Sequence, residues 1–388
     1  MIRRQALSTL HDLARGFPVL AITGPRQSGK TTLARMAFPN KPYLSLEDPD
    51  VLNRASADPR GFLRNHPDGA IIDEAQRFPP LFSYLQTLVD TGEPGRSFIL
   101  TGSQQFGLLS HISQSLAGRV GVIHLLPFSL AELGATWESP PELASLLYRG
   151  LYPPLYDRPV TPSQWYANYV TTYIERDVRS MLNIKDLSTF QRFLRMCAAR
   201  VGQLLNLSSL SSDCGISHNT AASWISVLEA SYIIHLLRPH HANFNKRLVK
   251  APKLLFFDPG LAAWLLQIRD SDQLAIHPQR GGLFECLIVS ELLKRRYNAA
   301  LPTNLFFWRD NHGTEIDLII DRGLELDPVE LKSGETVPAD FMKGLGKWLG
   351  WSKGKTTRGW LVYGGDQTYT QGAVHVVPWH QAAASLPL

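Results

Sequence analysis

The string Gly24-Pro-Arg-Gln-Ser-Gly-Lys-Thr31 constrains the fold of this chain more than any other feature. It follows a β-rich run, residues 18–23, and precedes a helix-forming run, residues 32–37. Its glycines let the backbone curl so that N–H groups point at phosphate oxygens. The lysine would reach the β- and γ-phosphates of a nucleotide, and the threonine hydroxyl would face Mg²⁺. The sequence therefore predicts a strand, a phosphate-binding loop and a helix in succession.

An acidic pair, Asp73 and Glu74, stands at the end of a second apolar run. The aspartate would hold Mg²⁺, directly or through water. The glutamate would polarise the attacking water as a general base, and a structural charge at a helix start is the alternative role. ATP and Mg²⁺ are therefore the expected cofactors, with Thr31 and Asp73 as metal ligands. The residues predicted to bind the nucleotide are Gly24, Pro25, Arg26, Gln27, Ser28, Gly29, Lys30, Thr31, Thr32, Asp73 and Ser103.

Five β-rich runs occupy the first third of the chain, with helical stretches between most of them. Such alternation predicts a parallel sheet with helices on both faces. The polar end of the fourth run fits the ATPases that place an extra strand between the phosphate loop and the acidic strand. Ser103 or Gln104 would then sense the γ-phosphate, and Ser103 is favoured. The five runs are Pro18–Thr23, Lys41–Leu46, Ala70–Asp73, Ser97–Thr101 and Val120–Leu126.

Arg119 follows the string Ser115-Leu-Ala-Gly118, just before the fifth run. A guanidinium at this point would act as an arginine finger on a neighbouring subunit's nucleotide, where it would stabilise transition-state charge. A surface or sheet-edge arginine is the alternative, and the residues alone do not decide between the two.

Length and composition limit the remaining possibilities. A chain of 388 residues is too long for one ordinary core, so we expect two or three domains. The apolar runs are far too short to span a membrane, and the three cysteines lack the spacing of a disulfide framework or zinc site. These features predict a cytoplasmic protein. The net charge of +5 and pI of about 9.0 weakly favour a polyanionic partner.

The middle of the chain predicts a winged helix. A proline-rich connector, residues 135–165, precedes two helical stretches, 166–184 and 187–205. Residues 207–232 then have the cadence of a helix-turn-helix, with apolar positions at helical spacing in its second helix. Two further β-rich runs, 233–238 and 253–257, would form the wing.

A winged helix often binds DNA through its second helix. Here that helix exposes hydrogen-bonding residues without positive charge, so phosphate contacts are expected from the wing loop instead. A structural lid or subunit contact is the alternative role for this module. The predicted nucleic-acid contacts are Lys246, Arg247 and Lys250.

The last third of the chain carries a Glu…Asp…Glu-x-Lys pattern formed by Glu285, Asp317, Glu330 and Lys332. Strand alternation puts the last two on one face. Carboxylate oxygens suit Mg²⁺, so the three acidic residues are predicted metal ligands. Glu285 would assist a second metal, and orienting Lys332 is its alternative role. The metal would polarise a scissile phosphate, and Lys332 would position the water or stabilise developing charge as a catalytic residue. Such cores also persist as binding modules, so retained cleavage is a separate question.

Strings along nearly the whole chain resemble a known family, the bacterial and archaeal AAA-type P-loop ATPases that carry a C-terminal domain of unknown function 4143. The resemblance implies ATP hydrolysis, a trans-acting Arg119, and a restriction-endonuclease-like, PD-(D/E)xK C-terminus. It marks Arg176 and the Lys246–Arg247 pair as recurrent basic positions, and only the string at residues 150–153 departs from the family pattern. The matching strings are GPRQSGKTTLA, AIIDEAQ, ILTGSQQ, SLAGRV, TYIERDV, LLNLSSL, LVKAPKLLFFDPGLA, FECLIVSELLK, FWRDNHGTEIDLII and PVELKSG.

The expected α/β architecture is therefore an AAA+ P-loop parallel sheet in residues 1–135, a helical and winged-helix domain in residues 136–275, and a nuclease-like α/β domain in residues 276–388. The leading function is an ATPase that engages branched or single-stranded DNA as a homo-oligomer, with Glu74, Arg119 and Lys332 as catalytic residues. Two alternatives stay open: a nucleotide-dependent signalling switch without nuclease activity, and a nuclease effector licensed by ATP.

Overall fold

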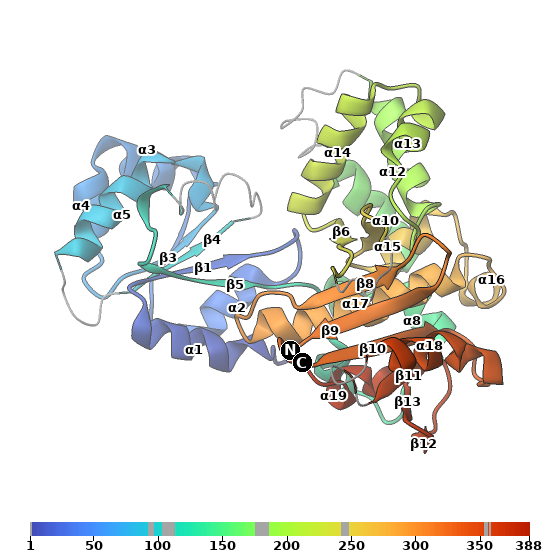
Figure 1. The fold of residues 1–388 in the computed structure, drawn as a ribbon. Helices are drawn as coiled ribbons and strands as arrows, with labels where there is room; N and C mark the ends of the chain where they lie inside the picture. Colours follow the sequence, from blue (N-terminus) through green and yellow to red (C-terminus); the bar gives the residue numbers. More distant parts are fainter. Residues whose placement is uncertain are drawn as a thin grey trace. The chain divides into compact units, whose positions relative to one another are not determined.

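The computed structural model describes residues 2–91, 97–102, 112, 114–174, 186–241, 248–352, 356 and 358–388. These residues form two compact units (Figure 1). The N-terminal unit comprises Met1–Phe128, Ala230–Tyr232 and Tyr297–Leu301, and the C-terminal unit comprises Ser129–Glu229, Ile233–Arg296 and Pro302–Leu388. Five residues singled out from the sequence lie outside the described residues: Ser103, Gln104, Arg176, Lys246 and Arg247.

The N-terminal unit is a parallel α/β sheet with strand order β2-β3-β4-β1-β5. All five predicted strands are present within their predicted ranges, and β4 lies between β1 and β3, as the extra-strand branch requires. The elements are α1 (Ala6–Gly16), β1 (Val19–Thr23), α2 (Lys30–Ala37), β2 (Tyr43–Ser45), α3 (Pro49–Ala57), α4 (Pro59–Arg64), β3 (Ile71–Asp73), η1 (Ala75–Arg77), α5 (Pro80–Asp90), β4 (Phe98–Thr101) and β5 (Val120–His124).

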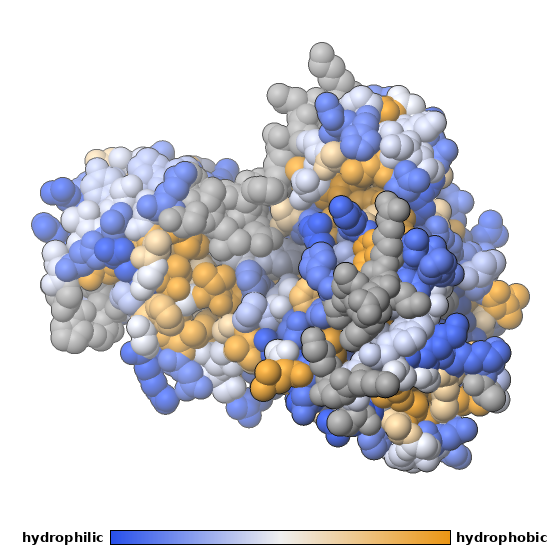
Figure 2. Space-filling model, viewed as in Figure 1, coloured by the Kyte–Doolittle hydropathy of each residue, from blue (hydrophilic) through white to orange (hydrophobic). Residues whose placement is uncertain are grey.

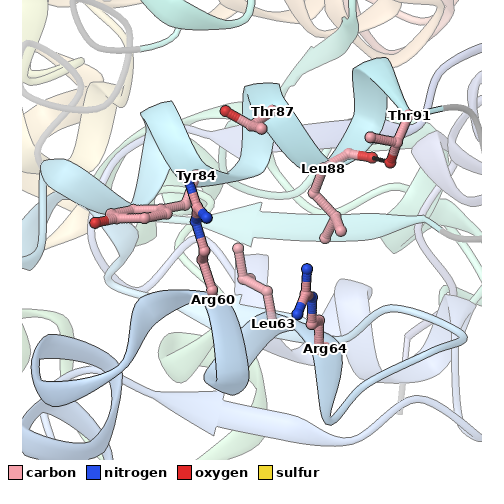
Figure 3. Close-up of a pocket in the computed structure, with 7 residues that line it drawn as sticks. All are labelled: Arg60, Leu63, Arg64, Tyr84, Thr87, Leu88 and Thr91. Atoms are coloured by element: carbon pink, nitrogen blue, oxygen red, sulfur yellow. Dashed lines mark hydrogen bonds between the residues drawn. The ribbon is translucent and has the colours of Figure 1, made fainter.

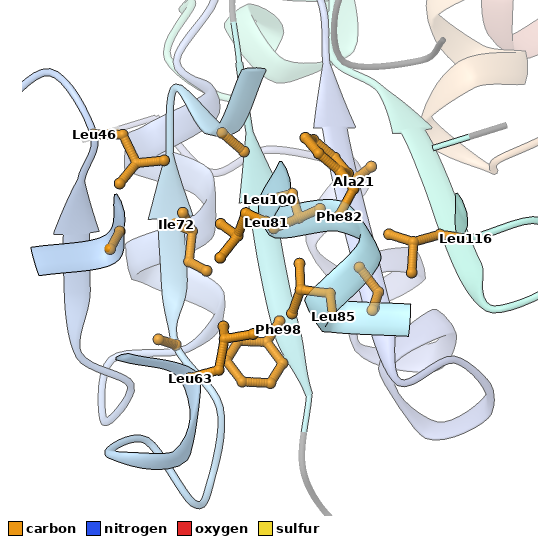
Figure 4. Packing of buried hydrophobic residues seen from close by; sticks show 14 of the residues in the cluster. Ala21, Leu46, Leu63, Ile72, Leu81, Phe82, Leu85, Phe98, Leu100 and Leu116 are labelled. Carbon is orange, nitrogen blue, oxygen red and sulfur yellow. The ribbon is translucent and has the colours of Figure 1, made fainter. Parts of the chain in front are cut away.

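Helices cover both faces of this sheet. Leu10 of α1 and Leu33 of α2 pack on one face with Leu20 and Ile22 of β1. The opposite face packs against α3, α4 and α5, as the side chains in Figure 4 show. Each fully buried leucine or phenylalanine contributes about 1.5–3 kcal/mol relative to an exposed one. Strands β1, β3 and β4 are therefore buried on both sides, which fixes the loops at their carboxyl ends.

The first part of the C-terminal unit is helical. The region expected to be an irregular connector instead forms short helices, because Pro154 and Pro162 occupy first-turn positions that suit proline. The elements are α7 (Leu130–Gly134), α8 (Leu143–Arg149), α9 (Pro154–Asp157), α10 (Pro162–Tyr169), the π-helical η2 (Val170–Ile174), α12 (Leu187–Ala198), α13 (Leu207–Cys214), α14 (His218–Ala230), β6 (Ile234–Leu237), β7 (Lys253–Phe256), α15 (Pro259–Leu265) and α16 (Ser271–Ala275).

The helix-turn-helix and wing take the expected form. Gly215, with φ +68°, makes the turn between α13 and α14, and Trp224 of α14 packs edge-on against Phe190 and Phe193 of α12. Strands β6 and β7 pair in antiparallel register, with Leu237 opposite Lys253. Helix α12 ends at Ala198, earlier than predicted.

A six-stranded mixed sheet, ordered β12-β13-β11-β10-β9-β8, completes the C-terminal unit. Strand β10 pairs antiparallel with β9 and parallel with β11. Buried residues of this sheet pack around Trp308 and Trp348. The elements are α17 (Arg280–Asn298), β8 (Leu305–Arg309), β9 (Glu315–Asp321), β10 (Leu326–Lys332), η3 (Ala339–Met342), α18 (Lys343–Trp351), β11 (Gly359–Tyr363), β12 (Tyr369–Gln371), β13 (Val374–Pro378), η4 (Trp379–Gln381) and α19 (Ala382–Ser385).

The surface is mostly hydrophilic on the face drawn in Figure 2, where apolar residues form separate patches. Among the described residues, Ile276 and Leu324 are the most exposed large apolar side chains, at 87% and 91%. No helix in the described parts of the chain combines the length and apolarity needed to cross a bilayer.

Candidate nucleotide site and C-terminal charge cluster

The phosphate loop connects β1 to α2, as predicted. Gly24 has φ +144°, and a Cβ atom there would lie 2.1 Å from the carbonyl oxygen of Leu125. Gly29 has φ +93° and immediately precedes the first helical residue, Lys30. Both positions therefore need glycine, one for close backbone approach and both for backbone conformation. The loop leads into the N-terminus of α2, where the first-turn N–H groups and the helix dipole favour anions.

Lys30 lies against the loop that precedes it. Its buried Nζ donates hydrogen bonds to the carbonyl oxygens of Gly24, at 3.0 Å, and Pro25, at 2.7 Å. These contacts hold the ammonium group beside the curled backbone, within the loop that would receive the phosphates.

Arg4 braces the phosphate loop, a role that the sequence did not reveal. One guanidinium nitrogen donates to the carbonyl oxygen of Ser28 and another to that of Leu126, both at 2.6 Å. The guanidinium also lies 5.0 Å from the ring centroid of Phe128. Because Arg4 is only 5% exposed, these bonds tie the loop firmly to the segment after β5.

Asp73, at the end of β3, is the centre of a hydrogen-bond network. Its carboxylate accepts from the Thr31 hydroxyl at 2.9 Å, from the Tyr43 hydroxyl at 2.6 Å and from the Thr101 hydroxyl. The N–H of Glu74 adds a fourth donor at 3.1 Å. The predicted pair of metal ligands, Thr31 and Asp73, is therefore brought together.

Two of these partners were missed by sequence reasoning. Tyr43 lies on the neighbouring strand β2, and Thr101 ends β4, two residues before the predicted sensor Ser103. Burial, followed by the hydrogen bond to Asp73, raises the pKa of Tyr43 to about 12. The phenol therefore stays protonated and remains a donor at neutral pH. The only sequence signal for Tyr43 was its position on the strand beside the one that ends in Asp73.

Glu74 follows Asp73 in a left-handed conformation, with φ +53°. This conformation is uncommon for a residue other than glycine, and such backbone strain concentrates at functional sites. Its carboxylate accepts a hydrogen bond from the Gln76 side chain. Glu74 is also the N-cap residue of η1, without a side-chain cap hydrogen bond, so its position is compatible with the alternative role of a charge at a helix start.

A small polar cluster lies directly before the phosphate loop. The Thr23 hydroxyl is 2.7 Å from Nδ1 of His124 and 3.0 Å from the Tyr232 hydroxyl, and that hydroxyl is 2.6 Å from the same Nδ1. Burial lowers the pKa of His124 to about 4, so the ring is neutral at physiological pH. The cluster therefore fixes the last residue of β1 through neutral hydrogen bonds.

Arg119 lies at the opposite end of the sheet from the phosphate loop. It precedes β5, whose first residue pairs with Val19 at the start of β1. Five residues at about 3.3 Å each separate that end from the loop, roughly 16 Å. Its guanidinium donates to Asp90 at 2.5 and 3.1 Å, and this contact raises the pKa of Arg119.

The N-terminal residues fit a nucleotide with Mg²⁺. The Oγ of Ser28 is buried in the loop without a hydrogen-bond partner among the described residues. The Thr31 hydroxyl and Asp73 carboxylate offer the hard oxygens that Mg²⁺ prefers. A pocket of about 510 Å³ in the same unit lies elsewhere, between α4 and α5 (Figure 3). Its lining residues, Arg60, Leu63, Arg64, Tyr84, Thr87, Leu88 and Thr91, include none of the phosphate loop.

The predicted acidic residues of the C-terminal unit lie together around two lysines. Lys332 Nζ is 2.7 Å from Glu330 Oε1 and 3.3 Å from Asp317 Oδ2. Lys253 Nζ, from β7, is 3.1 Å from Glu285 Oε2 and 3.7 Å from Asp317 Oδ1. Sequence reasoning missed Lys253, and it also missed Glu315, whose carboxylate forms another ion pair with Lys253.

Burial dominates the electrostatics of this cluster. It raises the pKa of Glu285 to about 7 and, with Asp317 adding to it, that of Glu330 to about 8. Burial also acts to raise the pKa of Asp317, but Lys253, Lys332 and the Leu331 N–H together hold it below its usual range. The cluster therefore contains more carboxylates than lysines.

The three predicted metal ligands of the C-terminal unit are not arranged to bind a metal ion. No group of three or more His, Cys, Asp or Glu residues in the described ranges is placed to hold a metal ion. Both oxygens of Asp317 face lysines, and Oε2 of Glu330 is buried without a hydrogen-bond partner. Of the predicted nucleic-acid contacts, Lys250 is exposed, and the other two lie outside the described residues.

Three family descriptions match the chain. Residues 16–134 match the AAA domain, residues 140–272 match a domain of unknown function, DUF8612, and residues 280–382 match another, DUF4143. Uncharacterized proteins of Mycobacterium bovis and Mycobacterium tuberculosis are each 31% identical over 324 residues, covering 82% of this chain and 71% of each relative.

Solved structures also resemble parts of the chain. A Walker-type ATPase of Pyrococcus abyssi has a TM-score of 0.46 and 16% identity, with 68% of this chain and 95% of that one covered. The ADP form of the Aeropyrum pernix ORC2 protein has a TM-score of 0.31 and 15% identity, covering 60% and 85%. The AAA-domain match and the two mycobacterial relatives carry the assignment: the chain belongs to the family of AAA-domain P-loop ATPases that carry a C-terminal domain of unknown function 4143.

Proposed function

We propose that this protein hydrolyses ATP with Mg²⁺ and uses the nucleotide cycle to engage DNA. The observation that carries the proposal is the hydrogen bond between Thr31 and Asp73, formed beside the Lys30 ammonium and followed by Glu74. Lys30 and the loop N–H groups bind the phosphates, and Thr31 and Asp73 hold the metal. Mg²⁺, when bound, supplies charge that neutralises the phosphate oxygens. Glu74 orients the water and accepts its proton.

Arg119 completes this site in a neighbouring copy of the chain. Its place at the far end of the sheet supports action in trans, because it cannot reach the phosphate loop of its own unit. The ion pair with Asp90 holds the guanidinium at the surface, where a neighbouring copy can receive it. The proposal therefore includes a homo-oligomer in which each hydrolytic site takes an arginine from the next protomer.

DNA engagement is assigned to the C-terminal unit. The helix-turn-helix α13–α14 exposes His218, Asn219 and Ser223, and Lys250 near the wing adds positive charge. The adjoining sheet carries a nuclease-like Glu-x-Lys strand beside Asp317. We assign branched or single-stranded DNA as the partner, bound through phosphates by basic groups and through bases by the helix.

The test measures Mg²⁺-dependent ATP hydrolysis with duplex, single-stranded and branched DNA while DNA integrity is followed in the same tubes. Wild type, Lys30→Ala, Glu74→Gln and Lys332→Ala are compared. The proposal expects DNA-stimulated hydrolysis in wild type and Lys332→Ala, with none in the first two variants. Hydrolysis that ignores both DNA and protein concentration would contradict it. Cleavage by wild type that Lys332→Ala abolishes would add nuclease activity.

A second candidate is a nucleotide-dependent signalling switch. The filled charge cluster favours it, because both lysines already neutralise part of the acidic core. A switch retains its nucleotide tightly and leaves every DNA substrate intact. Slow hydrolysis without stimulation by DNA would favour this second candidate.

A further inference from the structure

The pocket between α4 and α5 lies on the face of the N-terminal sheet opposite α1 and α2. Its volume of about 510 Å³ is within the range of about 300–1,000 Å³ that small-molecule sites occupy. In Figure 3, the side chains of Arg60, Leu63 and Arg64 extend from α4 toward α5. The α5 side chains that line the other wall recur at helical spacing: Tyr84, Thr87, Leu88 and Thr91. Two facing helices therefore build this pocket.

The two arginines of the pocket have no acidic partner. Within the described ranges, neither Arg60 nor Arg64 forms an ion pair, and Arg60 lies 6.0 Å from the centroid of the Tyr84 ring. The carboxylates on these helices have other partners. Asp58 caps α4 by accepting from the Gly61 N–H at 2.9 Å, and Asp90 of α5 pairs with Arg119. No described carboxylate therefore neutralises the two positive charges.

The position of these charges differs from that of arginines on an ordinary solvated surface. Arg60 and Arg64 are four residues apart on α4, where like charges repel by about 0.2–0.5 kcal/mol. Between them lies Leu63, which is only 2% exposed, and the half-buried Leu88 faces it from α5. A guanidinium is planar and matches phosphate or carboxylate oxygens with paired N–H groups. The pocket therefore suits a ligand that combines negative charge with an apolar body.

We propose that this pocket binds a small organic dianion, either a phosphate monoester or a dicarboxylate. Its charged oxygens accept hydrogen bonds from Arg60 and Arg64, and its apolar body lies on Leu63 and Leu88. The residues that line the pocket include no carboxylate, imidazole or thiol, so the ligand is held and not transformed. The site is separate from the phosphate loop and does not depend on the function proposed above.

The experiment measures binding of 4-fluorophenyl phosphate and 4-fluorophthalate to the full chain by fluorine NMR, without nucleotide. The first probe carries one phosphate and the second carries two carboxylates, so they distinguish the two sources of charge. Arg60→Gln and Arg64→Gln each remove one guanidinium. Arg15→Gln is the matched control, because Arg15 is an exposed arginine of α1 that pairs with Asp12. Lys30→Ala reports any binding at the phosphate loop, and thermal unfolding confirms that each variant folds.

We expect one bound probe per chain at a site that persists in Lys30→Ala. Arg60→Gln and Arg64→Gln each weaken binding at least about tenfold, because a hydrogen bond to a charged group is lost. Arg15→Gln binds as wild type does. Inorganic phosphate and 4-fluorophenol each bind more weakly than the organic dianions, because each provides only half of the ligand. The tighter of the two fluorinated dianions identifies the charged group that the pocket prefers.

Four results overturn the proposal. The first is equal binding by wild type and by folded Arg60→Gln and Arg64→Gln. The second is loss of all binding in Lys30→Ala, which assigns the probe to the phosphate loop. The third is inorganic phosphate binding as tightly as the organic dianions, which indicates a site for an ion alone. The fourth is displacement of the probe by a DNA duplex that requires both pocket arginines, which assigns the surface to nucleic acid. Because ATP hydrolysis is not the readout, failure here leaves the proposed function intact.

Discussion

At the scale of residues, Asp73 is held by more donors than a metal ligand strictly needs. Three hydroxyls and one backbone N–H converge on its carboxylate. Charge-assisted hydrogen bonds of this kind fix a side chain's orientation before any ligand arrives. The Tyr43 phenol is the most distinctive of these donors, because it reaches Asp73 from an edge strand.

Tyr43→Phe should lower kcat for ATP hydrolysis about tenfold, since hydrogen bonds to charged groups contribute about 1.5–3 kcal/mol. The affinity for ATP measured without Mg²⁺ should stay unchanged, because the phenol touches Asp73 and not the phosphate loop. Steady-state kinetics and nucleotide titration separate the two effects. Tyr84→Phe, in the pocket between α4 and α5, is the control that should leave kcat intact.

His124 makes stability depend on pH. Its pKa is lowered from 6.5 to about 4 by burial, so the unfolded chain binds the extra proton first as pH falls. The stability contributed by neutral His124 is therefore full above pH 6.5, and about 3 kcal/mol of it is lost as pH falls from 6.5 through 4. Denaturant titrations should show a shallower decline in this interval for His124→Gln. An identical slope in the variant would refute the assignment, since His235, also lowered to about 4, remains in both proteins.

At the scale of elements, the two ends of the N-terminal sheet carry different candidate residues. The carboxyl ends of β1 and β3 carry the nucleotide residues, and the amino end of β5 carries Arg119. In the proposed function, one chain presents a hydrolytic site at one sheet end and a finger at the other. The proposal therefore makes hydrolysis a property of neighbouring copies.

Mixing two inactive variants tests this polarity. Arg119→Ala keeps an intact hydrolytic site, and Glu74→Gln keeps an intact finger. Each alone should hydrolyse ATP at least about a hundredfold more slowly than wild type, as expected for loss of a finger or a general base. The mixture should regain activity, because some interfaces then join a good site to a good finger. If the mixture is no faster than either variant, Arg119 does not act in trans.

Sequence patterns predicted the helices and strands better than they predicted which side chains contact each other. Apolar runs located all five parallel strands. The signal is clearest for β1, β3 and β4, because burial on both faces leaves continuous hydrophobic stretches. The loop glycines and the Thr31–Asp73 pair followed from local chemistry. Arg4, Tyr43 and Lys253 could not be found, because their roles depend on contacts with residues far away in the chain. Prolines misled the prediction at residues 135–165, where they begin helices.

At the scale of the whole molecule, the AAA domain occupies the N-terminal part of the sequence and the domain of unknown function 4143 occupies the C-terminal part. The chain passes between the two compact units at Ser129, Ala230–Tyr232 and Tyr297–Leu301. Repeated crossing gives the nucleotide state several covalent paths to the C-terminal unit. We therefore expect the proposed ATP hydrolysis and the proposed DNA binding to be energetically coupled.

The most direct test of this coupling is the affinity for fluorescently labelled branched DNA, measured by anisotropy in defined nucleotide states. Glu74→Gln with ATP represents the bound state before hydrolysis, and Lys30→Ala represents the nucleotide-free state. If the nucleotide state controls DNA binding, the two dissociation constants differ by at least about tenfold, a coupling free energy of about 1.4 kcal/mol. Equal affinities in the two states, or no DNA binding in either, would contradict it.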